Sequence, residues 1–153
     1  MPITSMTTSN HELVVSVVSY AECITAIQAV RYQVFQCEQQ VAPELEFDGE
    51  DDAATHLIAR FNHKPVGTAR IRYLSDRLAK IERVAVLSDH RGLGIGRQLM
   101  DVAIAHIRNQ GIPEIKINAQ SHARAFYDKL GFQQRGDTFE EAGIPHIEMR
   151  LSL

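Results

Sequence analysis

Apolar positions in the first third of the chain form a short, nearly continuous run in one segment and recur at helical spacing in the next. Leu13–Val18 is a short β-branched run, which predicts a strand. Ser19 and Glu22 then form a capping-box pattern, which marks the first turn of a helix. Apolar side chains follow at helical spacing, at Ile24, Ile27, Val30 and Val34. We therefore expect a helix over Tyr20–Phe35.

The next segments have strand patterns separated by polar spacers. Residues 36–52 contain a proline, a glycine and many acids, which predicts a loop that could include a helical turn. Thr55–Phe61 and Val66–Tyr73 have the composition of two strands, and Asn62–Pro65 between them is turn-like. These two segments predict a pair of neighbouring strands.

A third strand pattern covers Ala79–Val86, and its apolar positions change parity within the strand. Ile81 lies at an odd position, whereas Val84 and Val86 lie at even ones. Because side chains alternate between the two faces of a sheet, this change indicates a β-bulge near Glu82–Val84. A strand buried on both faces is the alternative, since it would need no parity.

The second half of the chain alternates helices with strands. A helical pattern begins in the glycine-rich segment at residues 92–96 and ends at Gly111, two residues before a proline. A short helix opens at Gln120 or Ser121 and ends at Gly131. The strand patterns of this half are Glu114–Ala119, Phe132–Thr138 and His146–Leu151. Because helices separate strands here, the fold class is α/β with a mixed sheet.

The composition is that of an ordinary globular chain of one domain. The chain has 153 residues, of which 44% are hydrophobic and 23% charged. The net charge of −3 argues against a nucleic-acid-binding surface, and no apolar run is long enough to cross a membrane. Cys23 and Cys37 suit reduced thiols. We expect a cytoplasmic protein with a flexible tail over residues 1–12 and one domain over residues 13–153.

The glycine-rich segment Arg91–Arg97 lies between a strand and a helix. Its glycines allow a ligand to approach the backbone closely, and the first N–H groups of the following helix have no partner within the helix. Together with the helix dipole, these groups form an anion site suited to a phosphate or pyrophosphate. The segment lacks the Gly-Lys-Ser/Thr of a P-loop, and its GxGxG spacing differs from the GxGxxG of dinucleotide-binding folds. A turn that only opens a helix is the remaining alternative.

Several motifs of the chain resemble those of a known family. Arg91-x-x-Gly94-x-Gly96 resembles the R/Q-x-x-G-x-G/A motif of the GNAT superfamily of N-acetyltransferases, and Ile81–Val86 resembles that family's fourth strand, where a bulge is usual. Ala123-x-x-x-Tyr127-x-Lys129-x-Gly131-Phe132 resembles the family's second signature. Other segments are similar to the small bacterial ElaA-like branch: Arg31-x-x-Val34-Phe35-x-x-Glu38-Gln39, Asp48, His56 and Gly143–His146.

The resemblance implies a mostly antiparallel central sheet with flanking helices and a cleft where the family's fourth and fifth strands splay apart. The family binds acetyl-CoA in this cleft. By the resemblance, strand residues Val84, Ala85 and Val86 would pair with the pantetheine arm, as an added strand would. The pyrophosphate would be held by Arg91, Gly92, Leu93, Gly94, Ile95 and Gly96. Asn118 or Gln120 would contact the cofactor arm, because the position where the family often has asparagine is Gln120 here.

The resemblance also implies that Tyr127 protonates the departing thiolate. Direct acyl transfer needs a neutral amine and a protonated leaving group, and the ordinary pKa of tyrosine, about 10, is close enough to that of a thiol for this transfer. The proton acceptor stays open: Glu82 precedes the expected bulge, and His56, His122 and His146 are alternatives. No pair of histidines has metal-ligand spacing, so we expect no metal.

Two charged segments could bear on the acceptor. Residues Glu44–Asp52 contain six acids, which could attract a cationic amine, although a solvated loop is the simpler interpretation. For Arg70 and Arg72 we expect surface exposure.

The sequence therefore predicts an acetyl-CoA-dependent N-acetyltransferase that acts directly on a primary amine of a small molecule or peptide. The alternative is a non-catalytic module that binds acyl-CoA as a sensor. A homodimer through the C-terminal strands stays open.

Overall fold

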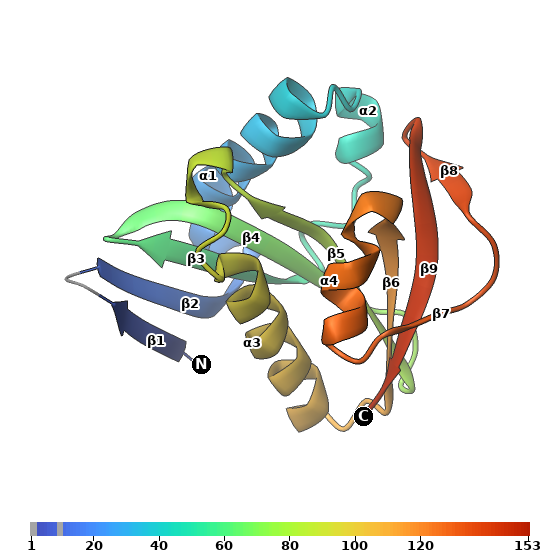
Figure 1. The fold of residues 1–153 in the computed structure, drawn as a ribbon. Helices are drawn as coiled ribbons and strands as arrows, with labels where there is room; N and C mark the ends of the chain where they lie inside the picture. The colour runs from blue at the N-terminus through green and yellow to red at the C-terminus, as the bar shows by residue number, and fades with distance from the viewer. Residues whose placement is uncertain (1–2, 9–10) are drawn as a thin grey trace.

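The computed structural model describes residues 3–8 and 11–153, whose strands form a single sheet. The strands are β1 (Ile3–Thr8), β2 (His11–Ser19), β3 (Thr55–Phe61), β4 (Lys64–Tyr73), β5 (Leu78–Val86), β6 (Glu114–Gln120), β7 (Gln133–Gln134), β8 (Phe139–Glu141) and β9 (Ile144–Ser152). Over these residues the order is β1-β2-β3-β4-β5-β6-β9-β7, with β8 paired to β9 (Figure 1). The β5–β6 pair is parallel and the other pairs are antiparallel, which confirms the predicted mixed sheet.

The helices form between these strands largely where the apolar spacing predicts them. They are α1 (Tyr20–Arg31), the π-helical segment η1 (Tyr32–Glu38), α2 (Pro43–Glu46), α3 (Ile95–Asn109) and α4 (Arg124–Lys129), with short 3-10 turns η2 (Ser88–His90) and η3 (Ser121–Ala123). The capping box is present, since Ser19 N donates to Glu22 Oε1 at 2.8 Å and Glu22 N donates to Ser19 Oγ at 3.3 Å. The first helix continues beyond its predicted end, because η1 prolongs it to Glu38.

Helices cover both faces of the sheet. Leu57 and Ala59 on β3 pack in one buried cluster with Leu99 of α3, whereas Ile58 packs on the opposite face with Ile27 of α1. Figure 1 shows α3 and α1 on opposite sides of the strands. The central strands are therefore buried on both faces, in keeping with the apolar runs in their sequence.

Strands β4 to β6 create the opening that positions the site. On β4, Thr68 and Arg70 pair with Ala85 and Glu82 of β5, so two residues of β5 oppose one of β4. One of these two, Arg83, has a left-handed backbone with φ of 56°, which confirms the bulge near Glu82–Val84. The structure pairs β5 with β6 only at the start of each strand, over residues 78–80 and 114–116. Beyond the last pair the two strands separate, as the splayed-strand prediction requires.

Two local predictions are wrong. Residues 3–8 are not part of a flexible tail, because β1 pairs with β2 along its length; the backbone supplies this pairing, and threonine suits strands. Residues 1, 2, 9 and 10 of that predicted tail lie outside the described residues. The predicted strand over Phe132–Thr138 is reduced to β7, because the chain turns at Gly136, where φ is 85°. No helix in the described part of the chain is long and apolar enough to cross a membrane.

Candidate active site

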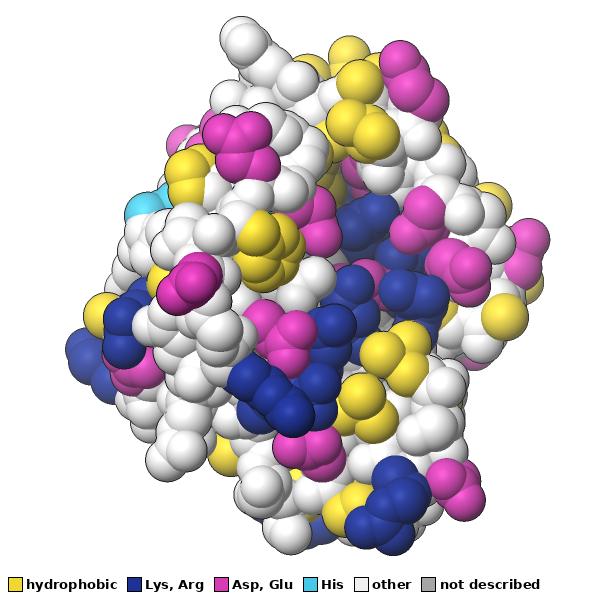
Figure 2. All heavy atoms as spheres, turned by 90° about the vertical axis from the view of Figure 1, so that its right-hand side faces the viewer, with side chains coloured by type: hydrophobic (Ala, Val, Ile, Leu, Met, Phe, Trp, Pro, Cys, Tyr) yellow, Lys and Arg dark blue, Asp and Glu magenta, His cyan; other side chains and the backbone are white. Residues whose placement is uncertain are grey.

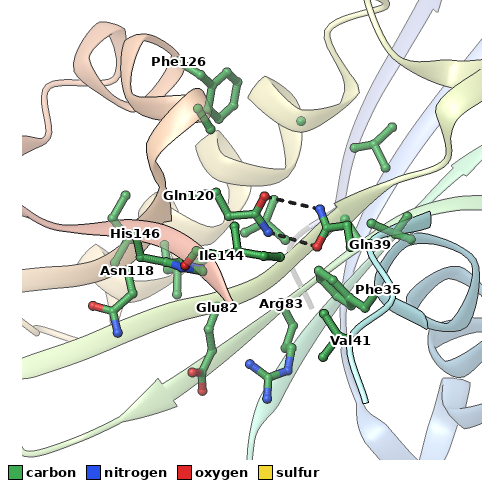
Figure 3. Close-up of a pocket in the computed structure, with 18 of the residues that line it drawn as sticks. Phe35, Gln39, Val41, Glu82, Arg83, Asn118, Gln120, Phe126, Ile144 and His146 are labelled. Atoms are coloured by element: carbon green, nitrogen blue, oxygen red, sulfur yellow. Dashed lines mark hydrogen bonds between the residues drawn. The ribbon is translucent and has the colours of Figure 1, made fainter. Parts of the chain in front are cut away.

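A cavity of about 1050 Å³ opens where β5 and β6 separate, and most of the residues predicted for the site line it. Its walls come from the bulged part of β5, the end of β6, the glycine turn before α3, the helix α4 and the end of η1 (Figure 3). The predicted site residues in the lining are Glu82, Val84, Ala85, Val86, Arg91, Gly92, Gly94, Ile95, Gly96, Asn118, Gln120 and Tyr127. Leu93 is not part of this described lining, and 53% of its surface is exposed.

The glycine turn at one end of the cavity has the backbone of an anion site. Gly92 and Gly94 have φ angles of 79° and 80°, a conformation that side-chain-bearing residues rarely adopt. A Cβ at either position would meet no atom within 4 Å, so the turn requires these glycines for their backbone conformation and not because of crowding. Gly94 is the N-cap of α3, and the first N–H groups of this helix lack partners within the helix.

Two polar contacts join the end of η1 to the walls of the cavity. Arg91 donates to both carboxylate oxygens of Glu38, at 2.5 and 2.6 Å. Gln39 and Gln120 exchange two hydrogen bonds through their side-chain amides, at 3.0 and 3.3 Å, and this pair spans the cavity in Figure 3. Neither Glu38 nor Gln39 was singled out as a site residue from the sequence, because their partners lie 53 and 81 residues away along the chain.

Tyr127 lies in the wall of the cavity and packs against its aromatic neighbours. Its ring centroid is 5.0 Å from that of Phe126 and 6.0 Å from that of Phe132, both in edge-to-face geometry. Burial raises the pKa of Tyr127 to about 12, so its hydroxyl is neutral and can donate a proton over the physiological range. Tyr127 therefore packs against two neighbouring aromatic rings and also lines the cavity.

Glu82 is surrounded by cations. Its carboxylate accepts hydrogen bonds from Arg70, at 2.8 and 3.1 Å, and from Arg72, and Lys80 Nζ lies 3.1 Å from Oε2. Burial alone would raise the pKa of Glu82, but the hydrogen bond from Arg72 and the charges of Arg70 and Lys80 outweigh it and lower the pKa to about 2. Glu82 is therefore a firmly ionised carboxylate with weak affinity for a proton.

The expectation of surface exposure is wrong for Arg70, whose side chain is fully buried. Its guanidinium contacts Asp48 at 2.7 Å and Asp51 at 3.0 Å, in addition to Glu82. Arg31 is also buried and pairs with Glu46 at 2.5 Å and Asp51 at 2.7 Å. Burial of an arginine is tolerated when its charge is matched by hydrogen-bonded carboxylates.

The acidic segment Glu44–Asp52, called the acidic loop below, therefore supplies the carboxylates that pair with these buried arginines. Glu46 and Asp51 are buried, and Asp48 is partly exposed and also contacts Arg83 at 3.2 Å. The hydrogen bond from Arg70 is the main cause that lowers the pKa of Asp48. The interpretation of this segment as a solvated loop is wrong for these three acids.

The three candidate histidines occupy different environments. His56 is buried beneath the loop, where Nε2 lies 3.0 Å from Asp51 O, and is outside the described lining of the cavity. His122 lines the cavity but contacts Gln120 Oε1 at 2.7 Å. His146 lines the cavity with Nδ1 2.7 Å from the carbonyl oxygen of Ile144 and Nε2 3.6 Å from Glu141. The described residues contain no group of three or more side chains arranged to hold a metal ion.

A mixed sheet with a cavity between two splayed strands and a glycine turn at a helix N-terminus is the architecture that the resemblance to the GNAT superfamily implies. A family model described as the acetyltransferase (GNAT) domain matches residues 16–153, so the chain belongs to the GNAT acetyltransferase family. The family assignment makes this protein an N-acetyltransferase.

Individual relatives agree with this assignment. The uncharacterised N-acetyltransferase YjcF of Bacillus subtilis is 36% identical over 121 residues, which cover 78% of this chain and 86% of that protein. The crystal structure of Escherichia coli ElaA is 28% identical, covers 90% of this chain and 98% of that one, and superposes with a TM-score of 0.79. A GNAT family acetyltransferase from Elizabethkingia anophelis with acetyl-CoA bound shares the fold at 18% identity and a TM-score of 0.71, over 92% of this chain and 98% of that one.

Proposed function

We propose that this protein transfers an acetyl group from acetyl-CoA directly to a primary amine of a small molecule or peptide. The observation that carries the proposal is the cavity between β5 and β6, which brings together an anion site, a bulged strand edge and Tyr127. The acetyl-CoA-bound relative of the same fold supports the choice of acyl donor.

The residues present suit acetyl-CoA. The glycine turn over residues 91–96 offers outward N–H groups for the pyrophosphate. The bulge separates Val84, Ala85 and Val86 from β6, so that their backbone is available to the pantetheine arm as to an added strand. Asn118 Oδ1 is buried without a hydrogen-bond partner in the described structure, which makes it a candidate acceptor for an amide of that arm.

Acetyl-CoA would supply a thioester whose carbonyl carbon the amine attacks, with formation of the C–N bond and cleavage of the C–S bond. Tyr127 would give its hydroxyl proton to the sulfur, because burial keeps this hydroxyl neutral until it reacts. The amine must lose a proton during the same reaction, so a second residue of the cavity has to accept one.

We assign the proton-accepting role to His146 and not to Glu82. The three cations around Glu82 make it a weak proton acceptor, although the sequence favours it for this part. In His146 the contact with Ile144 O requires a proton on Nδ1, which leaves Nε2 as the acceptor of the neutral ring. Glu141, 3.6 Å from Nε2, would stabilise the imidazolium that forms.

Two measurements, made one after the other, test the proposed function. Calorimetry with acetyl-CoA tests the donor, and thiol release with a panel of polyamines, aminoglycosides, amino acids and peptides tests the transfer. His146→Gln should lower kcat for thiol release by about 100-fold, whereas Glu82→Gln should leave kcat much less changed. Tight binding of acetyl-CoA without thiol release from any amine would favour a non-catalytic acyl-CoA sensor instead.

A further inference from the structure

Two side-chain amides meet across the mouth of the cavity, where β5 and β6 no longer pair. Gln120 is the last residue of β6, and Gln39 directly follows the last residue of η1. Gln120 Nε2 donates to Gln39 Oε1 at 3.0 Å, and Gln39 Nε2 donates to Gln120 Oε1 at 3.3 Å. In Figure 3 the pair crosses the cavity, with Phe126 on one side of it and Arg83 on the other. We call this pair the amide latch.

The amide latch links the two sides of the cleft that the separation of the strands creates. β5 and β6 pair over residues 78–80 and 114–116, so Gln120 lies four residues beyond the last pair. On the other side of the cleft, η1 packs on β5, since Val34 and Phe35 form a buried cluster with Ala85. A hydrogen-bonded link from β6 to η1 therefore closes this part of the mouth and turns the cleft behind it into a passage.

The backbone that carries Gln39 is held by contacts of its own. Gln39 N donates to Val34 O at 3.1 Å, within the last turn of η1. Gln40, the next residue, has a left-handed φ of 57°, which is uncommon for a residue with a side chain. The two charged hydrogen bonds from Arg91 to Glu38 fix the preceding residue to the glycine turn. The latch can therefore open by rotation of its two side chains while η1 stays in place.

The chemistry of the latch matches that of a pantetheine arm. A hydrogen bond between uncharged groups contributes little net free energy, because water takes its place when it breaks. Each glutamine amide has both donors and an acceptor, and so has each of the two amides of a pantetheine arm. An arm in the passage can therefore offer Gln39 and Gln120 the partners that they lose when the latch opens. His122 Nε2, 2.7 Å from Gln120 Oε1, orients the amide of Gln120.

We propose that the amide latch opens to admit the pantetheine arm of acetyl-CoA and closes over it. The inference rests on the proposed function, which puts the pyrophosphate at the glycine turn and the arm along residues 84–86 of β5. An arm that runs from this turn into the cleft must pass the latch, because the latch lies at the mouth. Gln39 is thereby a cofactor-binding residue that slows both the entry and the release of acetyl-CoA.

The cavity keeps another side open to solvent. In Figure 2 the surface of the molecule is hollowed where Lys and Arg side chains gather, and the cavity lining contains Arg72, Lys80 and Arg83. All three side chains are partly exposed. Closure of the latch over the arm therefore confines the cofactor and leaves the acceptor an approach to the thioester from this side.

Surface plasmon resonance with immobilised protein measures both rates. Gln39→Ala should raise kon and koff for acetyl-CoA about tenfold each and change Kd less than about threefold, because removal of the latch eases passage in both directions. Gln39→Asn keeps the amide on a side chain one methylene too short to reach Gln120, and it should behave like Gln39→Ala. Adenosine 3′-phosphate 5′-diphosphate, the nucleotide half of CoA without the arm, should bind and dissociate at the same rates in the wild type and in both variants.

Gln33→Ala is the matched control, because Gln33 is an exposed residue of η1 outside the described lining of the cavity. It should leave both rates unchanged. A rise in koff alone in the Gln39 variants would make Gln39 an ordinary contact and would overturn the inference. Altered rates for the nucleotide, or an equal effect of Gln33→Ala, would overturn it as well.

Failure of the latch and failure of the proposed function give different results. If the wild type bound no acetyl-CoA, the proposed function and the latch would both be refuted. If the wild type bound acetyl-CoA and released thiol, but the Gln39 variants kept its kon and koff, the latch alone would be refuted.

Discussion

Removal of the buried guanidinium of Arg70 should destabilise the fold by about 3 kcal/mol at pH 7. Arg70→Met keeps the apolar stem and leaves Asp48, Asp51 and Glu82 without one of their cations. Breaking a buried ion pair on one side costs about 3–5 kcal/mol. The lower end applies here, because Arg83, Arg31 and Arg72 still contact these carboxylates.

The lowered pKa of Glu82 gives the order of magnitude of the free energy that all of its neighbouring cations contribute together. A carboxyl group whose pKa falls from 4.5 to about 2 on folding contributes about 3 kcal/mol at neutral pH, since each pKa unit is worth about 1.4 kcal/mol. All of the cations around Glu82 share this contribution. Because the pKa is lowered in the folded state, the contribution is complete above pH 4.5 and is lost as the pH falls toward 2.

Urea unfolding, followed by circular dichroism at several pH values, measures both effects. The difference in free energy of unfolding between the wild type and Arg70→Met should be largest at pH 7 and should shrink below the unfolded pKa of the carboxyl groups. Arg108→Met, at an exposed position of α3, is the control and should change stability by less than about 0.5 kcal/mol. A difference below about 1 kcal/mol at pH 7, or one that does not vary with pH, would refute the reasoning.

Three further substitutions test the cavity. Tyr127→Phe should lower kcat for thiol release by about 100-fold or more without changing acetyl-CoA affinity in calorimetry; an unchanged kcat would contradict the acid role. Glu38→Gln releases Arg91 and should strengthen acetyl-CoA binding at low salt, and weaker binding would show that Arg91 needs its present partner. Gly94→Ala, at a φ of 80°, should cost about 1–2 kcal/mol in thermal unfolding and also weaken acetyl-CoA binding; a fully stable variant would contradict the need for glycine.

Predictions that depend on local pattern agree well with the structure. The capping box at Ser19 and the glycine turn that opens α3 involve residues within a few positions of each other, so they can be predicted from the chain. The bulge near Arg83 was predicted because a change of parity in an alternating strand leaves a direct mark on the apolar positions. Where the local signal was composition alone, as in the polar segment of β1, the prediction was wrong.

Predictions about charged side chains depended on contacts that the sequence does not reveal. Arg70 occupies an alternating position that would suit the surface, and its burial follows from carboxylates 19 and 22 residues away that the loop before β3 brings over it. The protonation behaviour of Glu82 depends on the same packing, since two of its cations, Arg70 and Arg72, come from a neighbouring strand.

By itself, the sequence determined most of the helices and strands, the bulge, the glycine turn and the resemblance to acetyltransferases. Each of these depends on residue types at short and regular spacing, which restrict the backbone directly. Only the tertiary structure decided which carboxylates are neutralised by arginines and which of the candidate histidines line the cavity. These properties depend on distances between segments far apart in the chain, because electrostatic energy varies with separation in space and not with separation in sequence.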